Sequence, residues 1–121
     1  EKGWGRVVHI SSSSAVMADA SLPYSSAKAA LNNYVKGLGQ RIADKGVLVN
    51  SVMPGPFIAE NNHWDIVKKN DPDRYEQFVN KRMSIKRLGT TDEIAQFVLF
   101  LSSELATLFV GTSIAIDGGI H

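Results

Sequence analysis

Tyr24 and Lys28 are the two residues whose types and spacing best suit acid–base chemistry. They stand four positions apart at the start of a segment with helical periodicity, which places both side chains on one helix face. A free phenol ionises only near pH ~10 and is a poor proton donor and acceptor at neutral pH. A nearby ammonium stabilises the phenolate, as does the positive end of the helix dipole. Taken alone, the pair also fits an ordinary amphipathic helix with a packed tyrosine and a solvated lysine.

Hydroxyl groups precede this pair. Four serines, residues 11–14, directly follow a short apolar run at residues 7–10, and Tyr24 comes twelve residues after Ser12. A parallel strand that ends in serines delivers them to the carboxyl edge of its sheet, where open α/β folds bind ligands. A second apolar run ends at Pro54 and Gly55, which marks a loop at the same edge.

The elements that must position these residues follow from periodicity and from turn signals. Residues 7–10 and 47–53 are predicted strands, because their apolar runs are rich in β-branched residues and bounded by Gly, Ser or Pro. Residues 11–23 are predicted to be a loop. The segment 24–45 has apolar residues at helical spacing, with Pro23 at its start and Gly46 at its end.

The second half of the chain continues this alternation. Residues 58–86 are more polar and predict one or two short amphipathic helices. Thr90 and Glu93 form a capping box that opens a buried helix to about residue 103, and residues 112–117 form a last short strand. Strands that alternate with helices imply parallel pairing through right-handed crossovers, so the fold class is α/β. The first strand is expected to leave an exposed sheet edge.

Composition narrows the function classes. The chain has 121 residues, enough for one small domain, and a formal net charge of +1 without a basic cluster, so no nucleic-acid partner is expected. It has no cysteine, no long apolar run and no signal peptide, which favours a cytoplasmic protein without a membrane partner. His9, His63 and His121 lack ligand spacing, so no metal site is predicted.

Five short motifs stand in order along the chain. They are Ile10-Ser11-Ser12, Tyr24-Ser25-Ser26-Ala27-Lys28, Val49-Asn50 followed after three residues by Pro54-Gly55, Arg87-Leu88-Gly89 followed after three residues by Glu93-Ile94-Ala95, and Ile116-Asp117-Gly118-Gly119. In this order and spacing they resemble the C-terminal half of the short-chain dehydrogenase/reductase family, in the branch of the 3-oxoacyl-acyl-carrier-protein reductases. The resemblance covers nearly the whole of residues 1–121 and implies half of a doubly wound, Rossmann-like parallel-sheet fold.

The resemblance also implies roles. Ser12 matches the catalytic serine that holds the substrate oxygen, with Ser11 as the alternative because the serine run leaves the register open by one. Tyr24 matches the general acid/base, and Lys28 matches the lysine that assists it and binds the nicotinamide ribose. Pro54, Gly55 and the backbone around Phe57 match the loop that lies against the nicotinamide. The implied activity is hydride transfer between a small-molecule carbonyl or secondary alcohol and NAD or NADP, between which the sequence does not discriminate.

The sequence also departs from the family pattern. No glycine-rich pyrophosphate turn follows a strand, so the N-terminal dinucleotide-binding half is expected to be absent, and Ala59 replaces a common cofactor-binding hydroxyl. A truncated, non-catalytic relative that acts as an oligomerisation or interaction module is therefore the alternative function. In the main interpretation the protein is a homo-dimer or homo-tetramer. Residues 58–86 match the variable substrate loop, in which Trp64, Tyr75 and Phe78 either line a pocket or pack on the core.

Overall fold

The computed structural model describes residues 3–121, and a parallel three-stranded sheet forms its centre. β1 (Gly5–Ile10) and β5 (Ser113–Ile116) both pair with β2 (Val47–Pro54), in the order β1-β2-β5. β2 is the middle strand and is buried along almost its whole length, as its unbroken apolar run predicts. The predicted α/β class and the parallel pairing are both confirmed.

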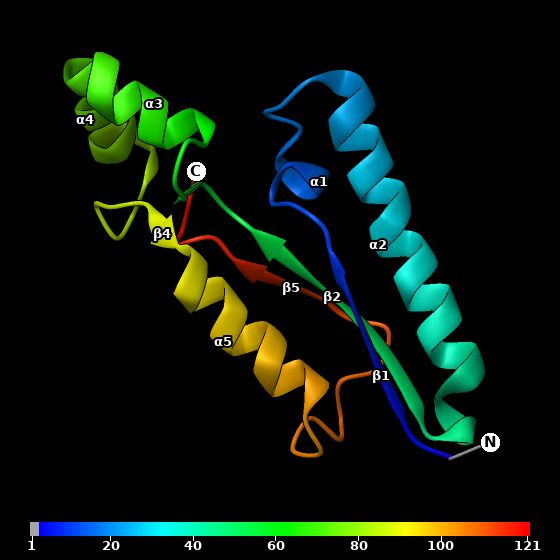
Figure 1. Ribbon diagram of the computed structural model, residues 1–121. Coiled ribbons are helices and arrows are strands. Elements are labelled where there is room, and N and C mark those ends of the chain that lie inside the picture. Colours follow the sequence, from blue (N-terminus) through cyan, green and yellow to red (C-terminus); the bar gives the residue numbers. More distant parts are fainter. Residues whose placement is uncertain (1–2) are drawn as a thin grey trace.

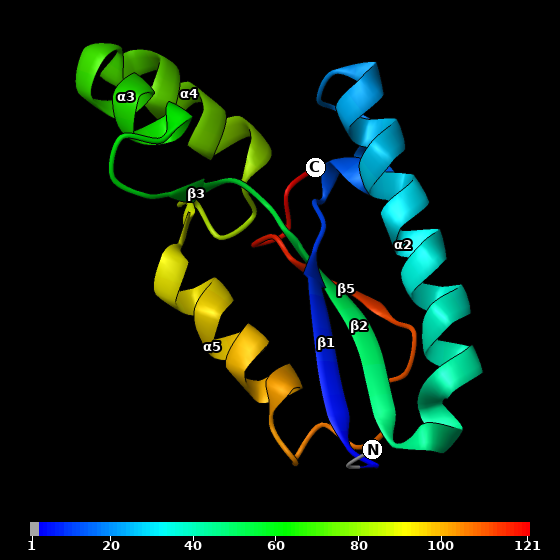
Figure 2. The same ribbon diagram turned by 45° about the vertical axis from the view of Figure 1, so that its right-hand side comes forward.

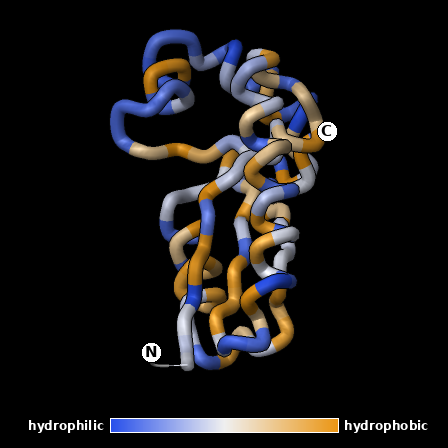
Figure 3. Tube along the Cα trace, turned by 90° about the vertical axis from the view of Figure 1, so that its right-hand side faces the viewer, coloured by the Kyte–Doolittle hydropathy of each residue, from blue (hydrophilic) through white to orange (hydrophobic). Residues whose placement is uncertain are grey.

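Two helices cover the two faces of this sheet. α2 (Leu22–Ile42) follows β1 and packs on β2 from one side, and α5 (Thr91–Ser102) packs on β1 and β2 from the other (Figures 1 and 2). The capping box of α5 is formed as predicted, because Thr90 accepts from the Glu93 amide and Glu93 accepts from the Thr90 amide. In Figure 3 the strands between these helices are coloured largely as hydrophobic.

Two element boundaries differ from the prediction. The segment expected to be a loop contains a four-residue helix, α1 (Ser14–Met17), which is too short to show a helical period in the sequence. α2 begins two residues before Tyr24, at Leu22, because Pro23 is tolerated in the first helical turn, and ends at Ile42. The 3-10 turn η1 (Ala43–Lys45) continues it to Gly46, whose positive φ of 77° ends the segment.

The polar stretch 58–86 folds into two helices, α3 (His63–Asn70) and α4 (Pro72–Arg82), as predicted. A second, very small sheet joins its two ends, because β3 (Phe57–Ile58) pairs in parallel with β4 (Gly89–Thr90). Strands of two residues carry no alternation signal, so this pair could not be predicted from the sequence. The small sheet holds the two ends of the 58–86 segment together and thereby positions α3 and α4 relative to the main sheet.

The apolar core consists of two clusters. One lies between the sheet and α5 around Val52, Leu101 and Ala106. The other lies under α4 around Val79, Met83, Leu88 and Ile120, so the C-terminal tail is part of it. At the open edge of the sheet, Ile10 is half exposed and adjoins an apolar groove on α5, which agrees with the exposed edge that the sequence predicts for the first strand.

Candidate active site

The site lies where β1 and β2 end side by side. Their parallel register pairs Ile10 with Val52, and the ladder continues past β1, because the Ser11 amide donates to Val52 O at 2.8 Å and the Ser13 amide donates to Pro54 O at 3.0 Å. The serine run is thereby fixed against the loop that begins at Pro54. Both segments thus lie at the carboxyl edge of the sheet, where parallel α/β folds bind ligands.

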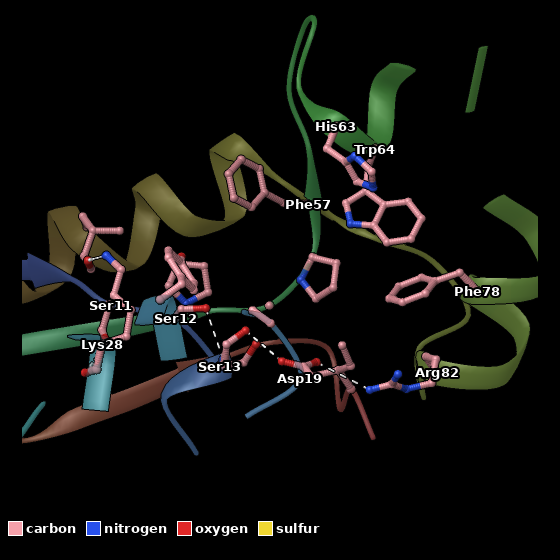
Figure 4. Close-up of a pocket in the computed structure, with 18 residues that line it drawn as sticks. Ser11, Ser12, Ser13, Asp19, Lys28, Phe57, His63, Trp64, Phe78 and Arg82 are labelled. Atoms are coloured by element: carbon pink, nitrogen blue, oxygen red, sulfur yellow. Dashed lines mark hydrogen bonds and ion pairs between the residues drawn. The ribbon is translucent and has the colours of Figure 1, made fainter. Parts of the chain in front are cut away.

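A cavity of about 620 Å³ opens at this edge (Figure 4). A volume of several hundred Å³ suits a small organic ligand. All of the site residues predicted from the sequence line this cavity, namely Ser11, Ser12, Tyr24, Lys28, Pro54, Gly55 and Phe57. Tertiary structure therefore brings together three segments that are separated in the sequence: the serine run, the first turn and a half of α2, and the loop after β2.

Tyr24 and Lys28 lie on the same face of α2, as their spacing predicts. The Lys28 ammonium is 5.6 Å from the centroid of the Tyr24 ring. Lys28 Nζ also donates a hydrogen bond of 2.8 Å to Ile10 O, the last carbonyl of β1. This bond anchors the start of α2 to the end of the strand. Tyr24 itself is 45% exposed, so its side chain is accessible to a ligand in the cavity.

The two candidate serines have different hydrogen-bond roles. The Ser11 hydroxyl donates to Lys28 O at 3.4 Å, so its hydrogen is directed at the helix backbone. The Ser12 hydroxyl instead accepts from the Ser14 amide at 3.1 Å. A hydroxyl that only accepts keeps its own hydrogen for another acceptor. The Ser12 hydroxyl thus keeps a free donor, whereas the hydrogen of the Ser11 hydroxyl is used on Lys28 O.

The opposite wall of the cavity comes from the 58–86 segment. Trp64 and Phe78 line it, with ring centroids 4.0 Å apart, and both also pack against the core cluster under α4. The two roles that the sequence left open for these aromatic residues are therefore both realised. Tyr75 packs against the same cluster but does not line the cavity.

Among the lining residues that the sequence did not indicate, three have titratable side chains: Asp19, His63 and Arg82. His63, for which the sequence predicts no metal-binding role, lines the cavity beside Trp64. Asp19 and Arg82 form an ion pair of 3.5 Å although 63 positions separate them in the sequence. No local pattern signals such a pair, because it depends on how α4 is placed against the loop after α1. Within residues 3–121, no group of three or more His, Asp or Glu side chains is arranged to hold a metal ion.

The comparisons with known proteins agree with this geometry. A family model described as enoyl-(acyl carrier protein) reductase matches residues 1–121. Acetoacetyl-CoA reductase of Cupriavidus necator is 38% identical over the whole chain, which spans 47% of that protein. The chain belongs to the short-chain dehydrogenase/reductase family. The family membership inferred from the five motifs is confirmed. The 3-oxoacyl-(acyl-carrier-protein) reductase of Buchnera aphidicola supports the branch of the family: it is 36% identical over the whole chain, which spans 48% of that protein.

Solved structures of this family superpose well on the chain. L-sorbose reductase from Gluconobacter frateurii, complexed with NADPH and L-sorbose, matches with a TM-score of 0.86 and 29% identity. A 3-oxoacyl-(acyl-carrier-protein) reductase from Agrobacterium tumefaciens with NADP bound matches with a TM-score of 0.89 and 28% identity. Each match covers 98% of this chain but only 48% and 45% of the respective structure. This short-chain dehydrogenase/reductase chain thus spans about half the length of its relatives. No helix among residues 3–121 is both long and apolar enough to cross a membrane.

Proposed function

We propose that this chain is the catalytic half of an NAD(P)-dependent oxidoreductase that interconverts a carbonyl compound and a secondary alcohol. The observation that carries the proposal is the convergence of Ser12, Tyr24 and Lys28 on one cavity at the carboxyl edge of the sheet. Relatives named as acetoacetyl-CoA reductase and 3-oxoacyl-(acyl-carrier-protein) reductase support the reaction type, and neighbours holding NADPH or NADP support the cofactor.

The residues at this edge fit a nicotinamide nucleotide. Lys28 Nζ uses one donor on Ile10 O, and an ammonium has two more for the ribose hydroxyls. In the loop after β2, Pro54 and Pro56 have no amide hydrogen, and the Gly55 amide donates to Ile116 O. The first amide after Gly55 is that of Phe57, and we propose that it donates a hydrogen bond to the carboxamide of the nicotinamide. When bound, the nicotinamide supplies or accepts the hydride.

The chain's own residues then handle the oxygen of the substrate. In reduction, the Tyr24 hydroxyl donates its proton to the carbonyl oxygen, and in oxidation the phenolate takes the proton back from the alcohol. Ser12 donates the hydrogen bond that holds and polarises the same oxygen, using the hydrogen that its contact with the Ser14 amide leaves free. The Lys28 ammonium, 5.6 Å from the centroid of the Tyr24 ring, places a positive charge beside the phenol that exchanges this proton.

Calorimetric titration of NADPH and NADH into the purified chain tests this proposal. We expect one of the two cofactors to bind more tightly than about 1 mM, and Lys28→Met to weaken that binding. Lys36→Met is the matched control, since this exposed lysine lies on the same helix but away from the cavity. A folded chain that binds neither cofactor would contradict catalysis by this chain alone and would favour the interaction-module alternative.

The assembly that we propose is a homo-dimer or homo-tetramer formed through α2 and α5. Tyr34 on α2 and Leu99 on α5 are large side chains that stand exposed on these helices, and their burial in an interface would be favourable. Sedimentation equilibrium of the chain and of Leu99→Lys tests this, since a charge at a buried interface should lower the association constant. A monomeric mass for the unsubstituted chain would contradict the proposal.

A further inference from the structure

Asp19 and Arg82 form a polar end of the cavity, where Asp19 adjoins Ser14 of the serine run and Arg82 lies farther from it (Figure 4). The chain turns sharply just before Asp19, because Ala18 has a left-handed φ of 53°. Arg82 is the last residue of α4. The two side chains are 26% and 38% exposed, so both are accessible to a molecule in the cavity.

Both groups retain hydrogen-bonding capacity. Asp19 Oδ1 accepts from the Ser14 hydroxyl at 2.8 Å, and Arg82 Nε donates to His121 O. The direct contact between Asp19 Oδ2 and Arg82 Nη2 is 3.5 Å, longer than the ~2.7–2.9 Å of a well-formed charge-assisted hydrogen bond. A carboxylate offers about four acceptor positions and a guanidinium five donors. A hydroxyl group between them can donate to Asp19 and accept from Arg82 at the same time.

The balance of charge favours an uncharged ligand at this end. A substrate carboxylate that approached Arg82 would also meet the Asp19 carboxylate, and a substrate ammonium that approached Asp19 would meet the guanidinium. A purely apolar ligand would remove water from both charged groups and offer no hydrogen bonds in its place, which is costly. A neutral hydroxyl avoids both penalties.

The wall beside the pair suits the carbon skeleton of such a ligand. Trp64 and Phe78 lie on the same side of the cavity as Arg82, and the Arg82 guanidinium is 5.9 Å from the Phe78 ring centroid. Aromatic side chains offer large apolar contact area for C–H groups. The lining of the cavity therefore combines an apolar wall, the donor–acceptor pair of Asp19 and Arg82, and the proposed catalytic groups Ser12 and Tyr24.

We infer that the site takes an uncharged, polyhydroxylated carbonyl compound or its alcohol, with a distal hydroxyl held between Asp19 and Arg82. The inference rests on the proposed function for the placement of the carbonyl at Ser12 and Tyr24. Asp19 and Arg82 are then specificity-determining residues, and the 58–86 segment acts on substrate choice through Arg82, Trp64 and Phe78.

Binding of three six-carbon probes tests the inference without requiring catalysis. D-Fructose, 2-hexanone and 2-oxohexanoate are titrated separately while the ¹H–¹⁵N signals of Arg82 Nε and Trp64 Nε1 are followed by NMR. We expect D-fructose to shift both signals and to bind at least about tenfold more tightly than either other probe. Equal or tighter binding of 2-hexanone or 2-oxohexanoate, or no shift with D-fructose, would overturn the inference.

Variants locate the effect in the ion pair. Asp19→Asn and Arg82→Gln should each weaken D-fructose binding by about tenfold or more, while Lys81→Gln, at an exposed position next to Arg82, should leave it unchanged. Folding of each variant is checked by its dispersed NMR spectrum. Undiminished D-fructose binding in either folded variant would also overturn the inference. NADPH titrated into the same samples separates the two proposals, because cofactor binding without D-fructose preference refutes the substrate class alone.

Discussion

The Lys28 ammonium lies 5.6 Å from the centroid of the Tyr24 ring while its Nζ donates to Ile10 O at the end of β1. One lysine therefore ties the start of α2 to the sheet and places a positive charge beside the phenol that we propose as the proton donor. This dual contact makes the position of Tyr24 a consequence of the β1–α2 packing.

Replacement of Tyr24 by Phe should abolish proton transfer but keep the fold, because the phenol is 45% exposed and no hydrogen bond within the described residues uses it. In a preparation with measurable carbonyl reduction, kcat should fall by about 10²–10⁴-fold. Cofactor affinity measured by calorimetry should stay within about twofold. Full activity of Tyr24→Phe would exclude this residue as the general acid/base.

Lys28→Met should weaken both functions of the lysine. Loss of the 2.8 Å hydrogen bond to Ile10 O is expected to lower the free energy of unfolding by about 0.5–1.5 kcal/mol in urea denaturation. Cofactor affinity should fall by about tenfold, since a charge-assisted contact to the ribose is lost. If Lys28→Met and Lys36→Met bind the cofactor equally well, Lys28 has no part in the cofactor site.

The two serines should differ in their effect on catalysis. Ser12→Ala removes the hydroxyl whose hydrogen is free, and kcat should fall by about 10²-fold or more, while loss of the hydrogen bond from the Ser14 amide should cost about 0.5–1.5 kcal/mol of stability. Ser11→Ala removes the contact to Lys28 O and should cost up to about 1 kcal/mol of stability while most activity remains. Parallel steady-state kinetics and denaturation of both variants test the assignment. The reverse pattern would make Ser11 the catalytic serine.

Gly39 marks the closest approach of α2 to the sheet. A Cβ at this position would lie 2.6 Å from Gly111 N and 2.9 Å from Val49 O, which are backbone atoms that cannot move aside cheaply. Gly39→Ala should therefore lower stability by about 1–3 kcal/mol. At Gly37 a Cβ would meet only the flexible end of Arg41, at 3.2 Å, so Gly37→Ala should raise stability by up to about 1 kcal/mol. Equal thermal unfolding of the two variants would refute this packing.

Glu93 should make the stability of the folded chain depend on pH in the acid range. Its hydrogen bonds with the Arg87 guanidinium and the Thr90 amide lower its pKa from 4.5 to about 2. Because the pKa is lower in the folded state, the contribution of Glu93 is present above pH 4.5 and is lost as the pH falls toward about 2. Melting temperatures measured across this window should fall less steeply in Glu93→Gln than in the unsubstituted chain. Identical slopes would show that the capping box does not depend on this charge.

The sequence by itself determined the order of the main strands and helices and pointed to the proposed catalytic residues. Apolar runs and helical spacing are local properties, so β1, β2, α2 and α5 were predicted with small boundary errors. The spacing of Tyr24 and Lys28 within one helix likewise fixes their common face. The ends of the two predicted parallel strands placed Ser12, Pro54 and Gly55 at the same edge of the sheet, and all three line the cavity.

Only the tertiary structure decided the contacts between distant segments. The Asp19–Arg82 pair spans 63 positions, and β3 with β4 closes a segment of about thirty residues through two-residue strands, so neither leaves a periodic signal. The hydrogen-bond partners of Ser11 and Ser12 likewise come from the tertiary structure, because adjacent serines are equivalent in a sequence pattern but meet different backbone groups once the chain is folded. Side-chain chemistry is encoded locally, whereas the partner of each polar group is set by packing.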